Sequence, residues 1–365
     1  MSFKKISIIG LGLIGGSMAA ALRRKQVVGH IVGIDDGHVI AEGLSRDLIN
    51  EGYRREDIQK GVIDVDLIIL ATPIKVTLMQ LPNVAKQVKP GTLITDVGST
   101  KVKIVNTASK YLPKDVYFLG GHPMTGSEKR GLEYADPFLF ENAVYVLTEN
   151  KSIPNKLIEK FVEMIEAIGA KVIFLPAKLH DEIAAVVSQL PQILAVTLMH
   201  YASNLNKKNS LYLKLAAGGF RDMTRVASSP FHIWTDICRT NEDNIKEAID
   251  QFMEELKTIK ELLSDSKLKP IFNDAARNRL SIPKDTRGFL RPHFNISIVV
   301  EDRPGVIANI STILASENIN IKDIEILKVR EGEAGTLRLA FESEAEREKA
   351  MQLLMKNRFQ VSKRE

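Results

Sequence analysis

The amino-acid sequence predicts three domains: an α/β domain of the Rossmann type over residues 1–176, an all-α domain over 177–285, and a small α+β domain over 293–365. Strand-like and helical segments alternate in the first part, which favours a parallel sheet covered by helices on both faces. No convincing strand occurs between Asp181 and Leu263. The last part has the order β-α-β-β-α-β, which is typical of a ferredoxin-like module.

Short apolar runs define the first domain. The expected strands are residues 5–10, 30–35, 66–71, 92–97, 116–120, 143–148 and 171–175. The run 66–71 is almost entirely apolar, as expected for a strand buried on both faces. The segment 14–25 is rich in alanine and leucine and ends on basic residues, which predicts a helix directly after the first strand.

The middle region has helical patterning. Residues 181–205 are almost continuously apolar and contain Pro191, so we expect a helix buried on all sides and kinked where the proline frees the carbonyl of Val187. Such an apolar helix is suited either to the core or to a subunit interface. Residues 283–292 are polar and bounded by prolines, which predicts a linker. The expected elements after it are strand 294–300, helix 306–317, strand 320–328, strand 336–341, helix 345–355 and strand 359–361.

Composition excludes several classes of protein. Lys and Arg number 50 against 45 Asp and Glu, and the resulting net charge of +5 is too small and too mixed to indicate a nucleic-acid partner. The single cysteine, Cys238, excludes an intrachain disulfide and fits a reducing compartment. We found no metal-ligand spacing, signal-peptide pattern or membrane-spanning run, so we expect a cytoplasmic protein without a metal or a membrane partner.

A glycine-rich loop follows the first strand. Residues 10–15 (GLGLIG) form a G-x-G-x-x-G motif between a strand and a helix, the context of a dinucleotide-binding site, although glycines are also required for turn geometry alone. Asp35 ends the next strand, where an acid bonds the adenosine ribose, and Asp36 beside it would repel a 2′-phosphate. This favours NAD over NADP. The expected cofactor-binding residues are Gly10, Gly12, Leu13, Ile14, Gly15, Asp35, Thr72 and Pro73.

Two further loops leave the carboxyl ends of expected strands, where open α/β sheets bind ligands. They are residues 96–101 (DVGSTK) and 120–129 (GGHPMTGSEK), and they place Ser99 and His122 beside a nicotinamide. A histidine can accept a hydroxyl proton as hydride leaves the same carbon. A structural role for His122, in which it bonds neighbouring backbone, is equally compatible with the pattern. The remaining histidines are expected to be structural or exposed: His30, His38, His180, His200, His232 and His293.

The helical region is interrupted by residues 218–225 (GGFRDMTR). It contains two arginines, Arg221 and Arg225, and an arginine can bind a carboxylate in a bidentate manner. The simpler alternative is a helix–helix turn with surface arginines.

Taken together, these motifs resemble the prephenate dehydrogenase family of tyrosine biosynthesis. The resemblance rests on residues 8–17 (IIGLGLIGGS), the two loops above, and GGFRDMTR with Trp234 nine residues later, and it extends from about residue 3 to 285. The C-terminal part resembles an ACT domain, a module that binds amino acids and regulates the attached enzyme. Its expected regulatory residues are Asp302, Pro304 and Gly305 (in DRPG).

The resemblance implies NAD-dependent oxidative decarboxylation of prephenate to 4-hydroxyphenylpyruvate by a homodimer that tyrosine inhibits through the ACT domain. His122 would accept the hydrogen bond of the substrate hydroxyl, Ser99 would orient His122, and Arg225 would bind a substrate carboxylate. The other residues that the resemblance places near the substrate are Glu128, Lys129, Gln189 and Trp234.

One motif departs from the family. Many members have Ser-His-Leu-Pro-His where this chain has Gln189 and Gln192 in place of the histidines. Glutamine forms hydrogen bonds but carries no proton at neutral pH. Arogenate therefore remains a possible substrate, as for an arogenate or dual-specificity cyclohexadienyl dehydrogenase. A non-catalytic sensor of NAD and amino acids is the alternative from another class, although it would not need His122, Ser99 and Arg225 together.

Overall fold

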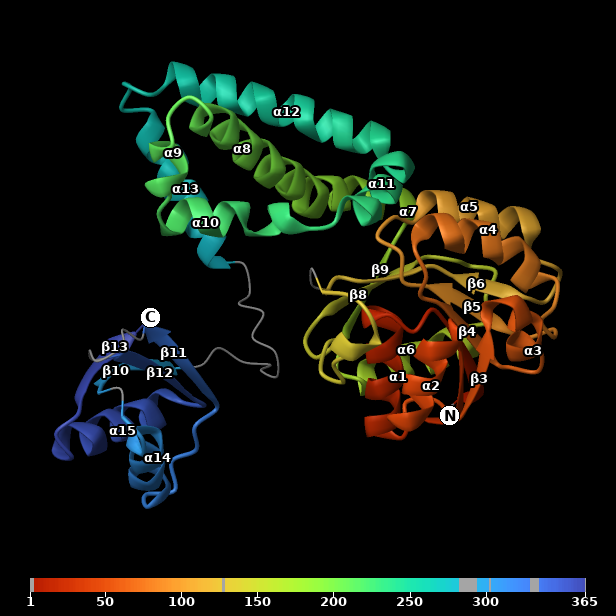
Figure 1. The fold of residues 1–365 in the computed structure, drawn as a ribbon, viewed down its shortest axis with the longest axis horizontal. Coiled ribbons are helices and arrows are strands. Elements are labelled where there is room, and N and C mark those ends of the chain that lie inside the picture. The colour runs from red at the N-terminus through yellow and green to blue at the C-terminus, as the bar shows by residue number, and fades with distance from the viewer. Residues whose placement is uncertain (1–2, 127–128, 282–293, 302, 329–334, 365) are drawn as a thin grey trace. The chain divides into compact units, whose positions relative to one another are not determined.

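The computed structural model describes residues 3–126, 129–281, 294–301, 303–328 and 335–364. The chain divides into two compact units, Met1–Gly288 and Phe289–Glu365, and each is described by itself (Figure 1). The first contains a parallel α/β sheet followed by helices, and the second is a small α+β unit. The predicted fold class is confirmed.

The main sheet has six strands in the described residues, in the order β3-β2-β1-β4-β5-β6, and every neighbouring pair is parallel. The strands are β1 (Phe3–Ile9), β2 (Val28–Asp35), β3 (Glu51–Arg54), β4 (Leu67–Leu70), β5 (Leu93–Asp96) and β6 (Tyr117–Leu119). Strand β3 was not predicted because its sequence, EGYR, has no apolar alternation and pairs only at the sheet edge. The strand order reverses between β1 and β4, which is where such sheets bind ligands.

Helices cover both faces of this sheet (Figure 1). Side chains alternate along each strand, so Ile8 of β1 belongs to one apolar cluster and Ile9 to the other. The first cluster joins the sheet to α1 (Leu13–Lys25), α2 (Gly37–Ser45) and α6 (Asn155–Ala167), and the second joins it to α3 (Ile58–Val62), α4 (Ile74–Ala85) and α5 (Val102–Tyr111).

A second, smaller sheet follows β6. It contains β7 (Gly121–Pro123), which is antiparallel to β8 (Val144–Thr148), and β9 (Lys171–Leu175), which is parallel to β8. Strands β8 and β9 were predicted, whereas β7 was expected to be a loop. His122 is the central residue of β7, and its partner across the sheet is Val146. The histidine is therefore held by strand pairing.

The helical region begins with α7 (Ala177–Ala184), a π-helical segment (Ala185–Gln189) and α8 (Leu190–Asn206). The π-helical segment lies where Pro191 was expected to free the carbonyl of Val187. It continues with α9 (Leu211–Lys214), α10 (Gly218–Thr224), a 3₁₀ turn (Arg225–Ser228), α11 (Phe231–Thr240), α12 (Glu242–Glu261) and α13 (Leu268–Ser281).

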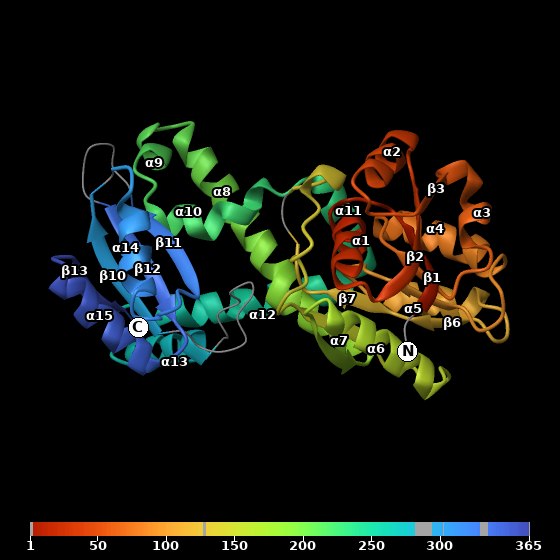
Figure 2. The ribbon, with the colours of Figure 1, turned by 90° about the horizontal axis from the view of Figure 1, so that it is seen from below.

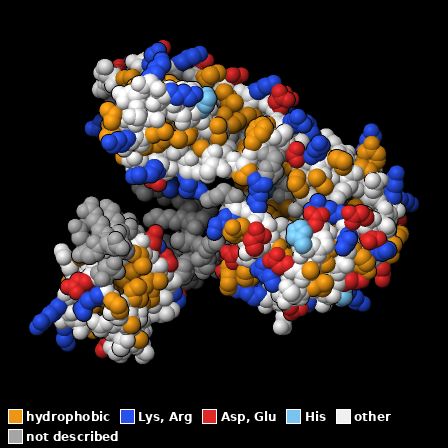
Figure 3. Space-filling model, viewed as in Figure 1, with side chains coloured by type: hydrophobic (Ala, Val, Ile, Leu, Met, Phe, Trp, Pro, Cys, Tyr) orange, Lys and Arg blue, Asp and Glu red, His pale blue; other side chains and the backbone are white. Residues whose placement is uncertain are grey.

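The expectation that residues 181–205 are buried on all sides is wrong. Val187 is 59% exposed and Tyr201 is 63% exposed, because α8 packs against its neighbours along one face only. Figure 3 shows apolar side chains gathered on the surface of this helical region. We expected no run long and apolar enough to cross a membrane, but Ala177–Asn206 is such a run by length and composition. A single helix of this kind is weak evidence of a membrane protein, because core helices of soluble proteins have the same length and composition.

The second unit contains β10 (Phe294–Val300), α14 (Val306–Ala315), β11 (Asp323–Lys328), β12 (Gly335–Phe341), α15 (Glu344–Lys356) and β13 (Gln360–Arg364). Its antiparallel sheet has the order β11-β12-β10-β13, and both helices pack on the same face (Figure 2). Gly305 caps α14 with a φ of +90°, and Pro304 before it is exposed. Asp302 lies outside the described residues.

The close packing of the glycine loop yields a stability prediction. A Cβ at Gly15 would lie 1.9 Å from the carbonyl oxygen of Gly10, whereas a Cβ at Gly12 would meet nothing within 4 Å. Gly15→Ala should therefore lower the free energy of unfolding in urea by about 1–3 kcal/mol, the usual cost of overpacking. Gly12→Ala, the matched control, should change it by less than about 1 kcal/mol. Equal effects would contradict this packing.

Candidate active site

The glycine loop lies at the point where the strand order reverses, between β1 and β4. Gly10 has a φ of +95°, and a Cβ on it would approach the carbonyl oxygen of Ala71 to 2.6 Å, so glycine is needed for packing there. The space around Gly12 is open, which leaves its backbone accessible to a pyrophosphate at the start of α1. The loop therefore fits a dinucleotide.

The other predicted cofactor residues border this loop. Leu13 and Ile14 form the half-buried first turn of α1. Thr72 and Pro73 follow β4 and begin α4, where the Thr72 and Thr77 hydroxyls are 3.0 Å apart. All four residues therefore lie near the carboxyl ends of β1 or β4.

Asp35 is buried at the end of β2. Its Oδ2 accepts a hydrogen bond from the backbone N–H of Leu11 at 2.7 Å, which ties β2 to the glycine loop. Its Oδ1 is 2.5 Å from Nη2 of Arg55, which also lies 3.0 Å from Oδ2 of Asp36. Arg55 was not expected here, because it is 20 residues from Asp35 in sequence. It directly follows β3, and the pairing of β3 with β2 brings it beside Asp35. Asp35 remains placed for a ribose, but Arg55 offsets the repulsion expected toward a 2′-phosphate.

His122 is the first member of a buried hydrogen-bonded chain that continues through His180 to Asp181. Its Nδ1 lies 2.8 Å from Nε2 of His180, and Nδ1 of His180 lies 2.8 Å from Oδ1 of Asp181. The His122 side chain is 8% exposed and His180 is 2% exposed. No hydrogen bond within the described residues engages Nε2 of His122. The expectation that His180 is structural or exposed therefore missed its contact with the candidate catalytic histidine.

Asp181 fastens this chain to the sheet. Its Oδ1 accepts from the backbone N–H of Lys101 at 2.7 Å, and its Oδ2 accepts from that of Val102 at 2.9 Å, at the start of α5. A carboxylate is favourable at a helix N-terminus, where backbone N–H groups have no partner within the helix. The side-chain amide of Asn241 donates to the Asp181 carbonyl at 2.8 Å. Residues at the start of α5, in α7 and at the start of α12 are therefore joined through Asp181, the first two at its carboxylate and the third at its backbone carbonyl.

A second buried pair holds the backbone before His122. The Lys101 ammonium contacts Asp96 and donates to the carbonyl of Gly121 at 2.6 Å, while Asp96 Oδ1 accepts from the Gly121 N–H at 3.2 Å. Both charged side chains are fully buried. A Cβ at Gly121 would come within 2.6 Å of the Asp96 carbonyl oxygen, which explains the glycine before the histidine. Lys101 and Asp96 were not among the predicted site residues.

Burial and the neighbouring charges set the protonation of this centre. Burial lowers the pKa of His122 well below its usual 6.5, and His180 and Lys101 lower this pKa further. Burial also lowers the pKa of Lys101, although Asp96 opposes that change. His122 is therefore uncharged at neutral pH, the form that can accept a proton.

The two glutamines that replace the family histidines have different surroundings. Gln189 is 1% exposed, and its Oε1 accepts from the Asn241 amide at 2.8 Å. Its Nε2 is buried and has no hydrogen-bond partner among the residues that the structure describes. Gln192 donates from Nε2 to the carbonyl of Val226 at 2.9 Å. That carbonyl lies in the 3₁₀ turn that begins at Arg225, so Gln192 anchors the backbone beside this arginine.

The remaining predicted substrate residues are less tightly placed. Arg225 is exposed, and Trp234 of α11 is half-buried against the apolar cluster that contains Ile74 and Ile104. Ser99 is half-buried, and no hydrogen bond in the described part of the chain joins it to His122. Lys129 is exposed, with its ammonium 5.1 Å from the centre of the Tyr134 ring. Glu128 lies outside the described residues.

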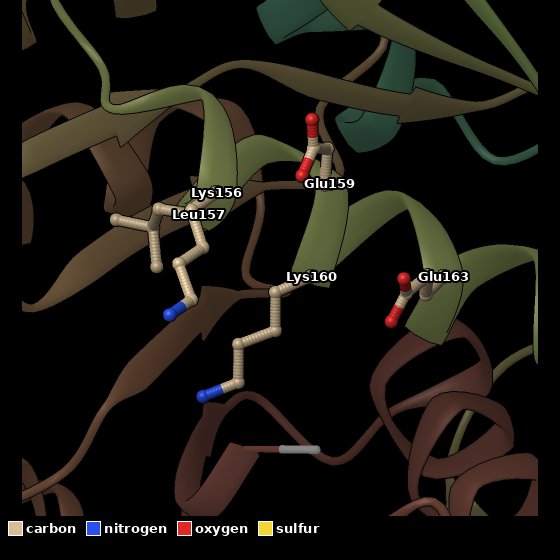
Figure 4. Close-up of a pocket in the computed structure, with 5 residues that line it drawn as sticks. All are labelled: Lys156, Leu157, Glu159, Lys160 and Glu163. Carbon is tan, nitrogen blue, oxygen red and sulfur yellow. The ribbon is translucent and has the colours of Figure 1, made fainter. Parts of the chain in front are cut away.

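Figure 4 shows five residues that line a pocket remote in sequence from these loops. The volume of this pocket is about 390 Å³. Its lining residues all belong to α6: Lys156, Leu157, Glu159, Lys160 and Glu163. None is a predicted site residue, and the alternation of lysines and glutamates is typical of a solvated helix face.

Three protein families match successive parts of the chain. Residues 18–174 match the nucleotide-binding domain of prephenate dehydrogenase, and residues 176–274 match its dimerization domain. Residues 296–357 match an ACT domain like that of the AHAS small subunit.

Similar proteins extend this result. Prephenate dehydrogenase of Bacillus subtilis (strain 168) is 36% identical over 96% of this chain and 95% of its own length. Cyclohexadienyl dehydrogenase of Zymomonas mobilis is 30% identical over 78% of this chain and 97% of its own. The crystal structure of Aquifex aeolicus prephenate dehydrogenase with hydroxyphenyl propionate and NAD+ has a TM-score of 0.72, with 30% identity over 78% of this chain and 99% of that one. The chain therefore belongs to the prephenate dehydrogenase family of NAD-dependent enzymes and carries an ACT domain at its C-terminus.

Proposed function

We propose that this enzyme acts on prephenate and converts it to 4-hydroxyphenylpyruvate, carbon dioxide and NADH. The observation that carries the proposal is the buried, uncharged His122, whose Nε2 has no protein partner within the described residues. Full-length similarity to the Bacillus subtilis enzyme supports the same substrate.

In this reaction Nε2 of His122 accepts the hydrogen bond of the substrate hydroxyl and holds its proton while the ring carbon becomes carbonyl-like. Bound NAD supplies the acceptor for the hydride that leaves this carbon. The ring carboxylate departs as carbon dioxide, its bonding electrons complete the aromatic ring, and His122 returns the proton to the phenol oxygen. We propose that Ser99 orients His122 and that Arg225 binds a substrate carboxylate, with Glu128, Lys129 and Trp234 near by.

Gln189 supports prephenate over arogenate, which carries an ammonium where prephenate carries a keto group. The Oε1 of Gln189 already accepts from Asn241, so the group left for a ligand is the Nε2 donor. An N–H donor pairs with a keto oxygen but not with an ammonium. The alternative is an enzyme that accepts both prephenate and arogenate, and it is favoured by the Zymomonas mobilis relative, which is named a cyclohexadienyl dehydrogenase.

The remaining parts of the proposal concern assembly and regulation. The match to a dimerization domain and the exposed apolar side chains of α8 support a homodimer in which this helix contacts a second subunit in the cytoplasm rather than a membrane. The ACT match supports a small-molecule regulator, and tyrosine, the product of the biosynthetic route, is the proposed inhibitor. We propose that Asp302, Pro304 and Gly305 take part in binding it.

The substrate is tested by the initial rate of NADH formation from NAD with prephenate or arogenate. We expect kcat/KM for prephenate to exceed that for arogenate by about tenfold or more, the value of one hydrogen bond to a suitable partner. Gln189→Glu should reduce this preference because it replaces the donor by an acceptor. A preference of the unmodified enzyme for arogenate would overturn the substrate but leave the family and the fold intact.

Regulation is tested by removing residues 293–365, since Phe289–Glu365 is a compact unit of its own. The shortened enzyme should keep its dehydrogenase activity and lose inhibition by tyrosine, measured as NADH formation at increasing tyrosine concentrations. Inhibition that persists, competitive with prephenate, would place tyrosine in the active site instead.

A further inference from the structure

We propose that His180 is a positioning residue that fixes the tautomer of His122, with Asp181 as its anchor. The proposal rests on the proposed function of His122 as the group that accepts the substrate proton. An imidazole can serve in that role only if the nitrogen facing the substrate has a free lone pair, and in a neutral ring the other nitrogen must then carry the hydrogen.

The direction of the hydrogen bonds follows from Asp181. Backbone N–H groups only donate, and those of Lys101 and Val102 engage both carboxylate oxygens of Asp181. A carboxylate only accepts, so Nδ1 of His180 must carry the hydrogen in their 2.8 Å contact. In the neutral ring of His180, Nε2 then has the lone pair.

The same logic continues to His122. Its Nδ1 lies 2.8 Å from Nε2 of His180, so Nδ1 of His122 carries the hydrogen and donates it. The two rings meet edge-on, with 75° between their planes and 5.0 Å between their centres. Nε2 of His122 is left as the acceptor. The alternative, with the hydrogen on Nε2 of His122, would require His180 to donate from both ring nitrogens and so to carry a charge in a position that is 2% exposed.

The supports of the backbone around His122 do not involve the His180 side chain. Asp96 and Lys101 hold the N–H and carbonyl of Gly121, and β8 pairs with the residue that follows it. Changing His180 should therefore leave the place of His122 in β7 intact and alter mainly its tautomer and ring orientation. If His180 had a purely structural role, changing it would instead lower the stability of the protein and weaken the binding of NAD and of the substrate together.

The experiment compares His180→Leu with His180→Gln. Leucine removes the acceptor, so kcat should fall about 100-fold or more, within the range for losing acid–base catalysis. Glutamine offers an amide N–H to Asp181 and an oxygen to His122, so kcat should stay within about tenfold of the unmodified enzyme. Both variants should bind NAD with unchanged Kd and remain folded, although His180→Leu should unfold at a lower urea concentration because the Asp181 carboxylate loses one donor. His30→Leu, near the amino end of β2 and outside both the site and the proposed subunit contact, is the matched control and should keep the kcat of the unmodified enzyme.

A second measurement does not require activity. Solid-state ¹⁵N NMR of histidine-labelled full-length protein, with the His122 signals assigned by their loss in His122→Asn, should show the hydrogen on Nδ1 and a bare Nε2. A hydrogen on Nε2 would overturn the proposal. So would a folded His180→Leu enzyme with normal kcat, or a folded His180→Gln enzyme as impaired as the leucine variant. An inactive unmodified enzyme would refute the proposed function instead, and the NMR result would still decide the tautomer.

Discussion

The buried carboxylate of Asp181 is the interaction on which the rest of the site depends. It accepts from two backbone N–H groups at the start of α5 and from His180, and the carbonyl of the same residue accepts from Asn241. Burying a charged group is costly unless hydrogen bonds satisfy it, and here the two backbone donors come from the start of α5 whereas Asp181 lies in α7. The same bonds therefore join the helical region to the sheet and orient the histidine pair.

The Lys101–Asp96 pair has a complementary role. Removing one partner of a buried ion pair typically costs about 3–5 kcal/mol, because the other charge is left uncompensated. In this protein the pair also bonds the N–H and the carbonyl of Gly121, so it fixes the position of the backbone from which His122 continues. Its positive charge helps to keep His122 uncharged. Lys101 and Asp96 thus contribute both to the stability of the fold and to the uncharged state of His122.

Much of this architecture was predictable from the sequence. The apolar strands, the glycine loop, the Pro191 irregularity and the β-α-β-β-α-β module are local patterns, and the structure contains them all. The polar strand β3 and the contact of Arg55 with Asp35 were not predictable, because they depend on pairing between distant segments.

The same limit applies to His180. Its contact with His122 joins residues 58 positions apart, and in sequence it is only a histidine at the start of a helix. The one local signal of this contact was the adjacent pair His180 and Asp181, which follows β9 in sequence. Lys101 was visible in the DVGSTK motif, but its burial was not, since lysines are rarely buried. The burial of α8 was overestimated because an apolar sequence does not distinguish a core from a subunit contact.

The central claim is that burial, together with the neighbouring His180 and Lys101, keeps His122 uncharged. Asp96 in turn pairs with Lys101, and Asp181 pairs with His180. It is tested most directly by the pH dependence of kcat/KM for the substrate at saturating NAD. Because the lowered pKa keeps His122 in its accepting form as the pH falls through 6.5, the acid limb of the profile should have its midpoint below 6.5. A midpoint at or above 6.5 would contradict the account.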